Sequence, residues 1–256
     1  MSKSEPQPQR RRGIYLLPNL FTTAALFAGF YGIVAAINGR FELAAVAIFI
    51  AMLLDGIDGR VARLTNTQTD FGAEYDSLAD MVSFGLAPAL VMYQWILSDL
   101  GKLGWLAAFI YTAGAALRLA RFNTQVSHAD KRYFQGLASP SAAAIVSGMV
   151  WTGETYQWSG PTVAAAAFLL TVLAGLLMVS NIRYHSFKGF NLKHKVPFVA
   201  ILLTVLVIVL VSANPPVMLF GGFLVYTVSG PVLTLVFLRR RRQERKTQRD
   251  SDPHQP

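Results

Sequence analysis

Two runs decide how this chain folds: Asp55-Gly56-Ile57-Asp58-Gly59-Arg60-Val61-Ala62-Arg63 and, eight residues later, Gly72-Ala73-Glu74-Tyr75-Asp76-Ser77-Leu78-Ala79-Asp80. Asp55 and Asp58 are three positions apart near the end of one apolar segment. Asp76 and Asp80 are four apart at the start of the next. On helices each pair shares a face. A hairpin between the segments would gather four carboxylates at the edge of a bilayer, where uncompensated charge is costly, so we expect a cation between them.

The composition is typical of a membrane protein. Of the 256 residues, 53% are hydrophobic and only 14% are charged, which is more apolar than a soluble domain of this size needs. The chain has no cysteine, so a disulfide framework and a thiolate metal site are both excluded. The net charge of +9 is concentrated in basic clusters on either side of the apolar region.

The apolar segments predict the fold class. A membrane-spanning helix takes about 20 apolar residues. On that measure we expect an all-α polytopic membrane protein, a bundle of about eight transmembrane helices. The expected spans are residues 19–37, 42–63, 75–98, 103–122, 138–153, 161–180, 196–212 and 215–238.

The lysines and arginines predict the orientation. With the amino terminus inside, every Lys and Arg except Arg40 and Lys102 falls in a cytoplasmic segment, as the positive-inside rule requires. We therefore expect an integral protein of the bacterial inner membrane whose active site and both termini face the cytoplasm. Basic runs can also bind nucleic acid. Because no recognition module accompanies them, we expect contact with membrane lipids and no nucleic-acid partner.

The same pattern predicts three regions. Residues 1–13 are polar and contain prolines, so we expect a disordered cytoplasmic tail. Residues 14–238 form the transmembrane domain, and residues 239–256 form a basic cytoplasmic tail. The chain shows no internal repeat, which weakens the case for a transporter built from two inverted halves.

The aspartates indicate metal chemistry. Compact oxygen-only ligands suit Mg²⁺ or Mn²⁺, and two such ions can neutralise a diphosphate and stabilise its leaving oxygen. A single aspartate at a helix end is often only a cap, which could account for Asp76 but not for Asp55 inside its apolar run. Because Gly59 has no side chain and Ala62 has only a methyl group, a substrate could approach that face of the helix closely. The Arg63 guanidinium offers several N–H donors to phosphate oxygens.

These residues resemble the signature of the CDP-alcohol phosphatidyltransferases, Asp-x2-Asp-Gly-x2-Ala-Arg-x(8 or more)-Gly-x3-Asp-x3-Asp. Every position is met, by Asp55, Asp58, Gly59, Ala62, Arg63, Gly72, Asp76 and Asp80. Arg121-Phe122-Asn123 and Tyr133-Phe134-Gln135-Gly136-Leu137 also resemble the serine-using branch of that family. One departure is Ala138, where that branch has a proline; it affects the stiffness of a turn more than the chemistry.

The resemblance implies transfer of a phosphatidyl group from CDP-diacylglycerol to the hydroxyl of L-serine, giving phosphatidylserine and CMP. It implies a homodimer. It also implies that Asp80 is the general base. The residues that it implies as metal ligands are Asp55, Asp58, Asp76 and Asp80, and those that it implies as contacts to the CDP-lipid are Gly59, Ala62 and Arg63.

The acceptor site and the alternatives depend on other residues. Because serine carries a carboxylate, we expect a cation near the aspartates, and Arg118, Arg121 and Asn123 at the inner end of the fourth span are the serine-binding hypothesis. Positive-inside anchoring would explain both arginines equally well. A sister transferase that uses glycerol 3-phosphate or inositol phosphate is the nearest alternative. A divalent-cation transporter whose aspartates line a path is the alternative of another class.

Overall fold

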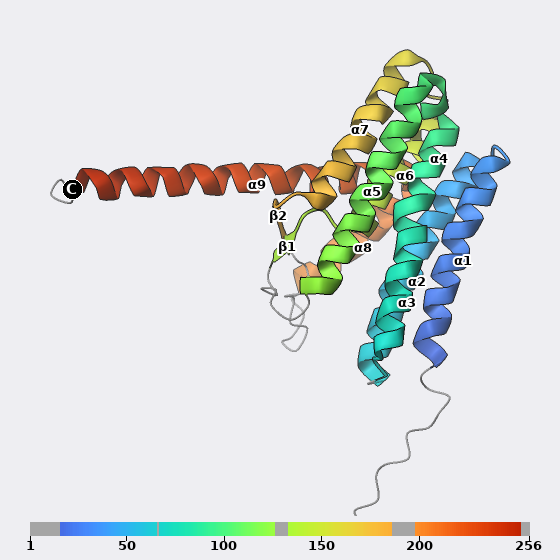
Figure 1. Cartoon of the computed structure of the whole chain (residues 1–256), viewed down its shortest axis with the longest axis horizontal. Helices are drawn as coiled ribbons and strands as arrows, with labels where there is room; N and C mark the ends of the chain where they lie inside the picture. Colours follow the sequence, from blue (N-terminus) through green and yellow to red (C-terminus); the bar gives the residue numbers. More distant parts are fainter. Residues whose placement is uncertain (1–15, 66, 126–132, 186–197, 252–256) are drawn as a thin grey trace, which may run out of the picture.

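A computed structural model describes residues 16–65, 67–125, 133–185 and 198–251, and most of these residues are helical (Figure 1). The bundle begins with the hairpin of α1 (Leu16–Ile37) and α2 (Phe41–Thr65). The next helical column consists of α3 (Asp70–Asp80), the π-helical η1 (Met81–Leu86) and α4 (Ala87–Trp95), followed by the 3₁₀-helix η2 (Leu97–Leu100). The remaining helices are α5 (Lys102–Gln125), α6 (Ser139–Thr155), α7 (Pro161–Val179), α8 (Phe198–Ala213) and α9 (Pro215–Ser251).

The all-α fold is confirmed, and each of the eight expected segments coincides with a helix or a helical column. The expected number of about eight spans is a little high. Within the described residues, four helices are long and apolar enough to cross a membrane, at Leu17–Ile37, Lys102–Thr124, Pro161–Val179 and Pro215–Thr234. The physical reason is length and charge: α6 has 17 residues and α8 has 16, while α2 carries two aspartates and two arginines in its second half.

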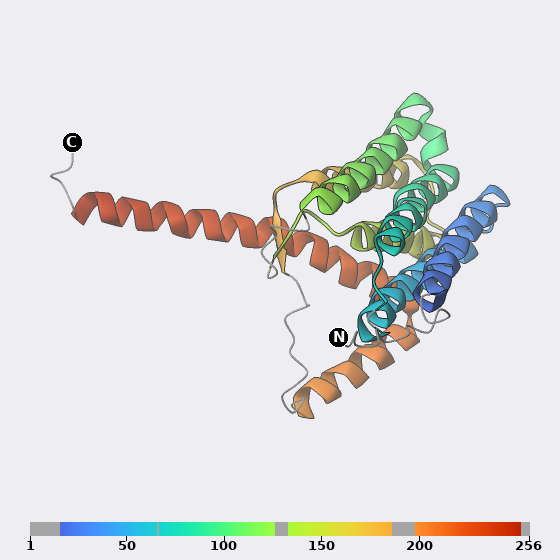
Figure 2. The ribbon, with the colours of Figure 1, turned by 60° about the horizontal axis from the view of Figure 1, so that its bottom comes forward.

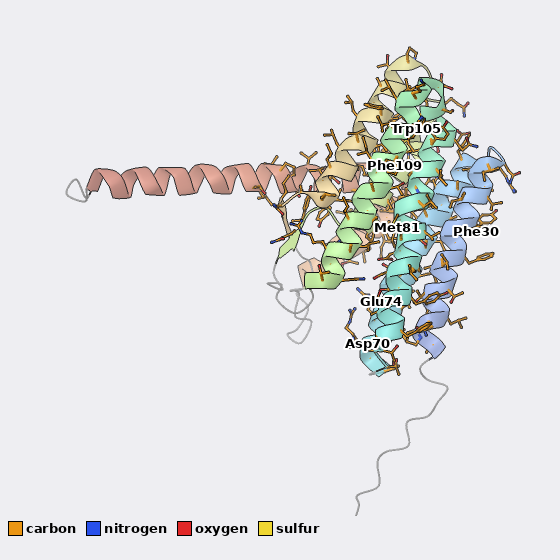
Figure 3. The ribbon with its side chains drawn as sticks, viewed as in Figure 1. Phe30, Asp70, Glu74, Met81, Trp105 and Phe109 are labelled. Atoms are coloured by element: carbon orange, nitrogen blue, oxygen red, sulfur yellow. The ribbon has the colours of Figure 1, made fainter. Side chains whose placement is uncertain are left out.

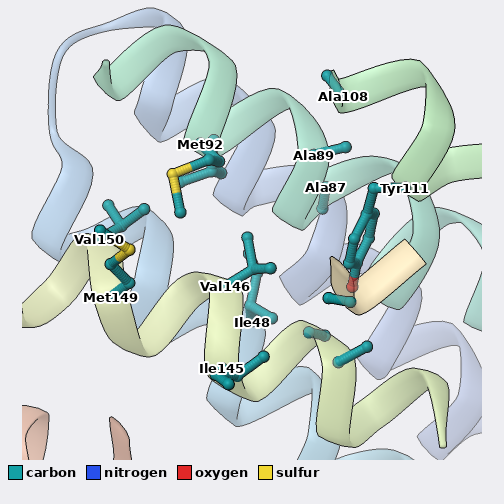
Figure 4. Packing of buried hydrophobic residues seen from close by; sticks show 14 of the residues in the cluster. Ile48, Ala87, Ala89, Met92, Ala108, Tyr111, Ile145, Val146, Met149 and Val150 are labelled. Carbon is teal, nitrogen blue, oxygen red and sulfur yellow. The ribbon is translucent and has the colours of Figure 1, made fainter. Parts of the chain in front are cut away.

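Small residues let the helices pack closely. A Cβ atom added at Gly114 of α5 would lie 2.5 Å from the carbonyl oxygen of Gly175 on α7, so these two backbones are in direct contact. Larger buried side chains fill the centre, among them Ile48, Tyr111 and Val146 from three different helices (Figure 4). Such packing fixes the helices relative to one another and thereby fixes the polar side chains that they carry.

The outward faces of the helices are apolar. Phe30 of α1 and Phe109 of α5 are 58% and 59% exposed and point away from the bundle (Figure 3). Exposed side chains of this size are costly in water and cost nothing against lipid tails, so they fit an integral membrane protein.

A short sheet that the sequence did not predict joins two connecting segments. β1 (Tyr133–Gln135) pairs antiparallel with β2 (Arg183–His185), and Phe134 lies opposite Tyr184. The Gly136 N–H continues the ladder by donating to the Ile182 carbonyl oxygen at 2.8 Å. The segment that enters α6 is therefore tied to the segment that leaves α7.

The last helix leaves the bundle. α9 packs against α6 over its first turns and then extends away from the other helices (Figures 1 and 2). Its backbone stays helical to Ser251, so the predicted boundary at 238/239 is not a break in the helix. The predicted tail at 1–13 and the end of the second tail, residues 252–256, lie outside the described residues.

Candidate active site

Three of the four predicted aspartates lie together. Asp55 of α2, with Asp76 and Asp80 of α3, each offer one carboxylate oxygen within 4.8 Å of the others. All three residues are half-buried. The i, i+4 spacing in α3 places Asp76 and Asp80 on one face, and the α2–α3 hairpin turns Asp55 toward that face. In Figure 3 this part of α3 lies between the labelled Glu74 and Met81.

Asp58 stands apart from this group. It is only 4% exposed, and its Oδ2 accepts a hydrogen bond of 2.7 Å from the Thr22 hydroxyl of α1. Its charge still reaches the Asp76 carboxyl electrostatically. The structure therefore brings all four aspartates to one region. Three of them form the cluster, and the fourth, Asp58, is hydrogen-bonded to α1.

The three gathered carboxylates fit a divalent cation. Oxygen ligands of Mg²⁺ lie about 2.1 Å from the ion, so two ligand oxygens on opposite sides of it are about 4.2 Å apart. The carboxylate oxygens, which lie within 4.8 Å of one another, match that spacing after small side-chain adjustments. The donor set consists of hard oxygen atoms, which suit magnesium or manganese.

The predicted phosphate-binding residues share one surface of α2. Arg63 is exposed, and its Nη1 and Nη2 lie 3.8 and 3.9 Å from the position that a Cβ at Gly59 would take. Ala62 is half-buried beside Arg63 in the chain. The guanidinium therefore lies next to backbone that carries no side chain.

The three predicted serine-binding residues take different places. Arg118 interacts electrostatically with Asp80, and its Nη1 donates to the Ser139 hydroxyl at 2.7 Å. Asn123 exchanges hydrogen bonds with the hydroxyl of Ser77, the residue after Asp76. Arg121 instead donates to the Val179 carbonyl oxygen at 3.2 Å and to the Asn181 side chain, at the end of α7.

A π-helical turn fixes where Asp80 lies. η1 begins at the next residue, Met81, and its wider turn leaves backbone carbonyls to be bonded from outside the helix. The buried Tyr111 hydroxyl donates to the Phe84 carbonyl oxygen at 2.9 Å. The Ser83 hydroxyl donates to the Ala25 carbonyl oxygen at 3.1 Å. Asp80 is therefore positioned from both α5 and α1.

Sequence reasoning missed the contribution of α1. Besides Thr22 at Asp58, the Thr23 hydroxyl lies 2.9 Å from the Tyr75 hydroxyl of α3. The signal that could have found them is the polar group Asn19, Thr22 and Thr23 at the head of an otherwise apolar segment. Polar side chains in a lipid-embedded helix face protein, because lipid offers them no partner.

Known proteins with similar sequences extend over most of the chain. A profile of the CDP-alcohol phosphatidyltransferase family matches residues 15–230. A protein of Helicobacter pylori named CDP-diacylglycerol–serine O-phosphatidyltransferase is 37% identical over 216 residues, which cover 84% of this chain and 90% of that protein. A Mycobacterium tuberculosis protein of the same name is 40% identical over 56% of this chain and 52% of its own. An archaetidylserine synthase of Methanothermobacter thermautotrophicus is 33% identical over 68% of this chain and 71% of its own.

Proposed function

This chain belongs to the CDP-alcohol phosphatidyltransferase family, and we propose that it transfers the phosphatidyl group of CDP-diacylglycerol to the hydroxyl of L-serine, giving phosphatidylserine and CMP. The observation that carries the proposal is the carboxylate group of Asp55, Asp76 and Asp80, gathered by the hairpin that bears the family signature. The names of the H. pylori and M. tuberculosis relatives supply the acceptor.

Asp55, Asp76 and Asp80 would hold a divalent ion, Mg²⁺ or Mn²⁺, and Asp58 would add negative charge from the side. Such an ion, when bound, neutralises the diphosphate of the CDP-lipid and stabilises the charge on the leaving oxygen. The four aspartates would otherwise repel one another in a region where water is scarce. Their arrangement is thus best explained by a cation.

Gly59, Ala62 and Arg63 would contact the CDP-lipid. A nucleotide can approach backbone at Gly59 that a larger side chain would cover. Arg63 would donate bidentate hydrogen bonds to phosphate oxygens at the same surface. Since its guanidinium already lies within 4 Å of the Gly59 Cβ position, little movement is needed for both contacts.

Asp80 would act as the general base. In this proposal its carboxylate takes the proton of the serine hydroxyl while that oxygen attacks the phosphorus. The bond between phosphorus and the CMP oxygen breaks, and CMP leaves with the bonding electrons. The neighbouring Arg118 interacts electrostatically with Asp80, and the serine carboxylate would lie beside its guanidinium. Asn123 would line the same side, whereas Arg121 bonds to the end of α7.

The remaining assignments concern the whole protein. We expect a homodimer in the bacterial inner membrane, with the aspartate hairpin and both termini on the cytoplasmic side. The distribution of lysine and arginine supports this orientation.

The test is CMP release from CDP-diacylglycerol by the detergent-purified protein, with serine, glycerol 3-phosphate and inositol phosphate offered separately. We expect release with serine, loss of release with a chelator, and recovery with Mg²⁺ or Mn²⁺. Asp80→Asn should lower turnover by at least about a hundredfold, because base catalysis contributes that much. Glu74→Gln, a change at an exposed residue on the same helix, should keep full turnover. Release with only another acceptor would contradict the assignment of serine.

A further inference from the structure

Arg118 has one donor that the described part of the chain leaves unused. Its Nη1 is bonded to Ser139, but its Nε is buried and has no hydrogen-bond partner among the described residues. Buried polar atoms almost always find a partner, and an exception calls for a ligand or another explanation. An oxygen atom of a bound molecule beside Nε would complete the guanidinium.

Helix α9 brings a phenol to the same guanidinium. Tyr226 interacts electrostatically with Arg118, and its ring packs against the Tyr184 ring of β2 with centroids 5.6 Å apart. Tyr184 is itself fixed, since its hydroxyl donates to the Thr227 carbonyl oxygen at 3.0 Å. Burial raises the pKa of the Tyr184 hydroxyl to about 12, so that it stays a neutral donor. The Tyr184 ring also lies directly against the backbone of α9, since a Cβ added at Gly230 would lie 2.3 Å from it.

The inference rests on the proposed transfer to serine and deepens it. We propose that Arg118, Ser139 and Tyr226 form the site for the acceptor carboxylate, and that Tyr226 is a residue that determines acceptor specificity. The carboxylate would accept from Arg118 Nε and from the Tyr226 hydroxyl, while Ser139 holds the other side of the guanidinium.

The place of this site suits an amino acid whose hydroxyl must reach Asp80. In serine the hydroxyl and the carboxylate are borne by neighbouring carbon atoms. Arg118 interacts electrostatically with both Asp80 and Tyr226, so its guanidinium is shared by the base and the phenol. A carboxylate held at Arg118 would therefore leave the hydroxyl on the side of Asp80. The Tyr226 ring would also limit the size of the acceptor.

The decisive variant is Tyr226→Phe, which removes one hydroxyl and keeps the ring. Its matched control is Tyr184→Phe, the same chemical change on the adjacent ring, whose hydroxyl donates to the backbone carbonyl of Thr227. We expect Tyr226→Phe to raise the KM for serine at least fivefold and to leave the KM for CDP-diacylglycerol within twofold. Tyr184→Phe should leave both constants within twofold. Ser139→Ala should raise the KM for serine as well.

Ethanolamine is serine without its carboxylate. Comparing the two acceptors distinguishes a loss of carboxylate recognition from a general disturbance of packing in the variant. Wild type should prefer serine strongly in kcat/KM, and Tyr226→Phe should lower that preference at least fivefold. An unchanged preference, or equal rises in the KM values for serine and CDP-diacylglycerol, would overturn the carboxylate site. If wild type itself released no CMP with serine, the proposed function would fall instead, so the two failures are distinguishable.

Discussion

Asp58 is the aspartate whose surroundings differ most from those of the others. Its carboxylate is buried and accepts a hydrogen bond from Thr22, whereas Asp55, Asp76 and Asp80 each turn a carboxylate oxygen toward the other two. A hydroxyl donor to a buried carboxylate stabilises its charged form. This bond offsets part of the cost of burying Asp58 and holds its carboxylate toward α1, apart from the three that would share a cation.

At Gly59 the absence of a side chain can be tested directly. A methyl group there would contact the Arg63 guanidinium at an ordinary distance, so Gly59→Ala should fold normally. It would occupy the surface that we assign to the nucleotide. We expect the KM for CDP-diacylglycerol to rise roughly tenfold, equivalent to about 1.4 kcal/mol, with an unchanged KM for serine.

Gly56→Ala is the control for that experiment. It lies one turn earlier on α2, and a Cβ there would meet nothing within 4 Å. Kinetics of CMP release for both variants give the answer. Equal effects of the two alanines on KM would show that the loss comes from the helix and not from the nucleotide surface.

At the scale of elements, the contact between α1 and η1 positions the catalytic hairpin. A Cβ added at Gly29 would lie 2.5 Å from the Ser83 Oγ and 2.7 Å from its Cα, so the backbones would have to separate. We expect Gly29→Ala to destabilise the protein by about 1–3 kcal/mol, as overpacking does. It should also lower activity, because η1 directly follows Asp80.

Thermal unfolding in detergent measures this effect. The matched control is Gly221→Ala on α9, where a Cβ would meet nothing within 4 Å. Alanine favours a helix over glycine by up to about 1 kcal/mol, so the control should not lower the melting temperature. A Gly29→Ala protein as stable and as active as this control would refute the close contact.

For the whole molecule, the testable statement is its orientation in the membrane. The chain contains no cysteine, so single introduced cysteines report on one position each. Ser98 in η2 and Gln68 in the α2–α3 connection are both exposed and lie at opposite ends of the α3–η1–α4 column. With the aspartate hairpin inside, a membrane-impermeant maleimide should label Ser98→Cys in intact cells and Gln68→Cys only after permeabilisation. The reverse pattern would place the hairpin outside.

The sequence by itself determined the helical membrane fold and the aspartate hairpin. Hydrophobic segments and the spacing of Asp55, Asp58, Asp76 and Asp80 are local properties, and local periodicity fixes which residues share a helix face. The count of membrane-crossing helices was less accurate. Helices α6 and α8 are shorter and α2 is more polar than the four helices that are long and apolar enough to cross a membrane, although all of them belong to the same bundle.

Only the tertiary structure decided how the site is divided. It separated Asp58 from the other three carboxylates, turned Arg121 to the end of α7 while leaving Arg118 beside Asp80, and brought Tyr226 from the last helix to Arg118. Each of these contacts joins residues that are at least 36 positions apart in the chain. No local pattern encodes them, because they depend on which small residues allow two helices to approach and at what height.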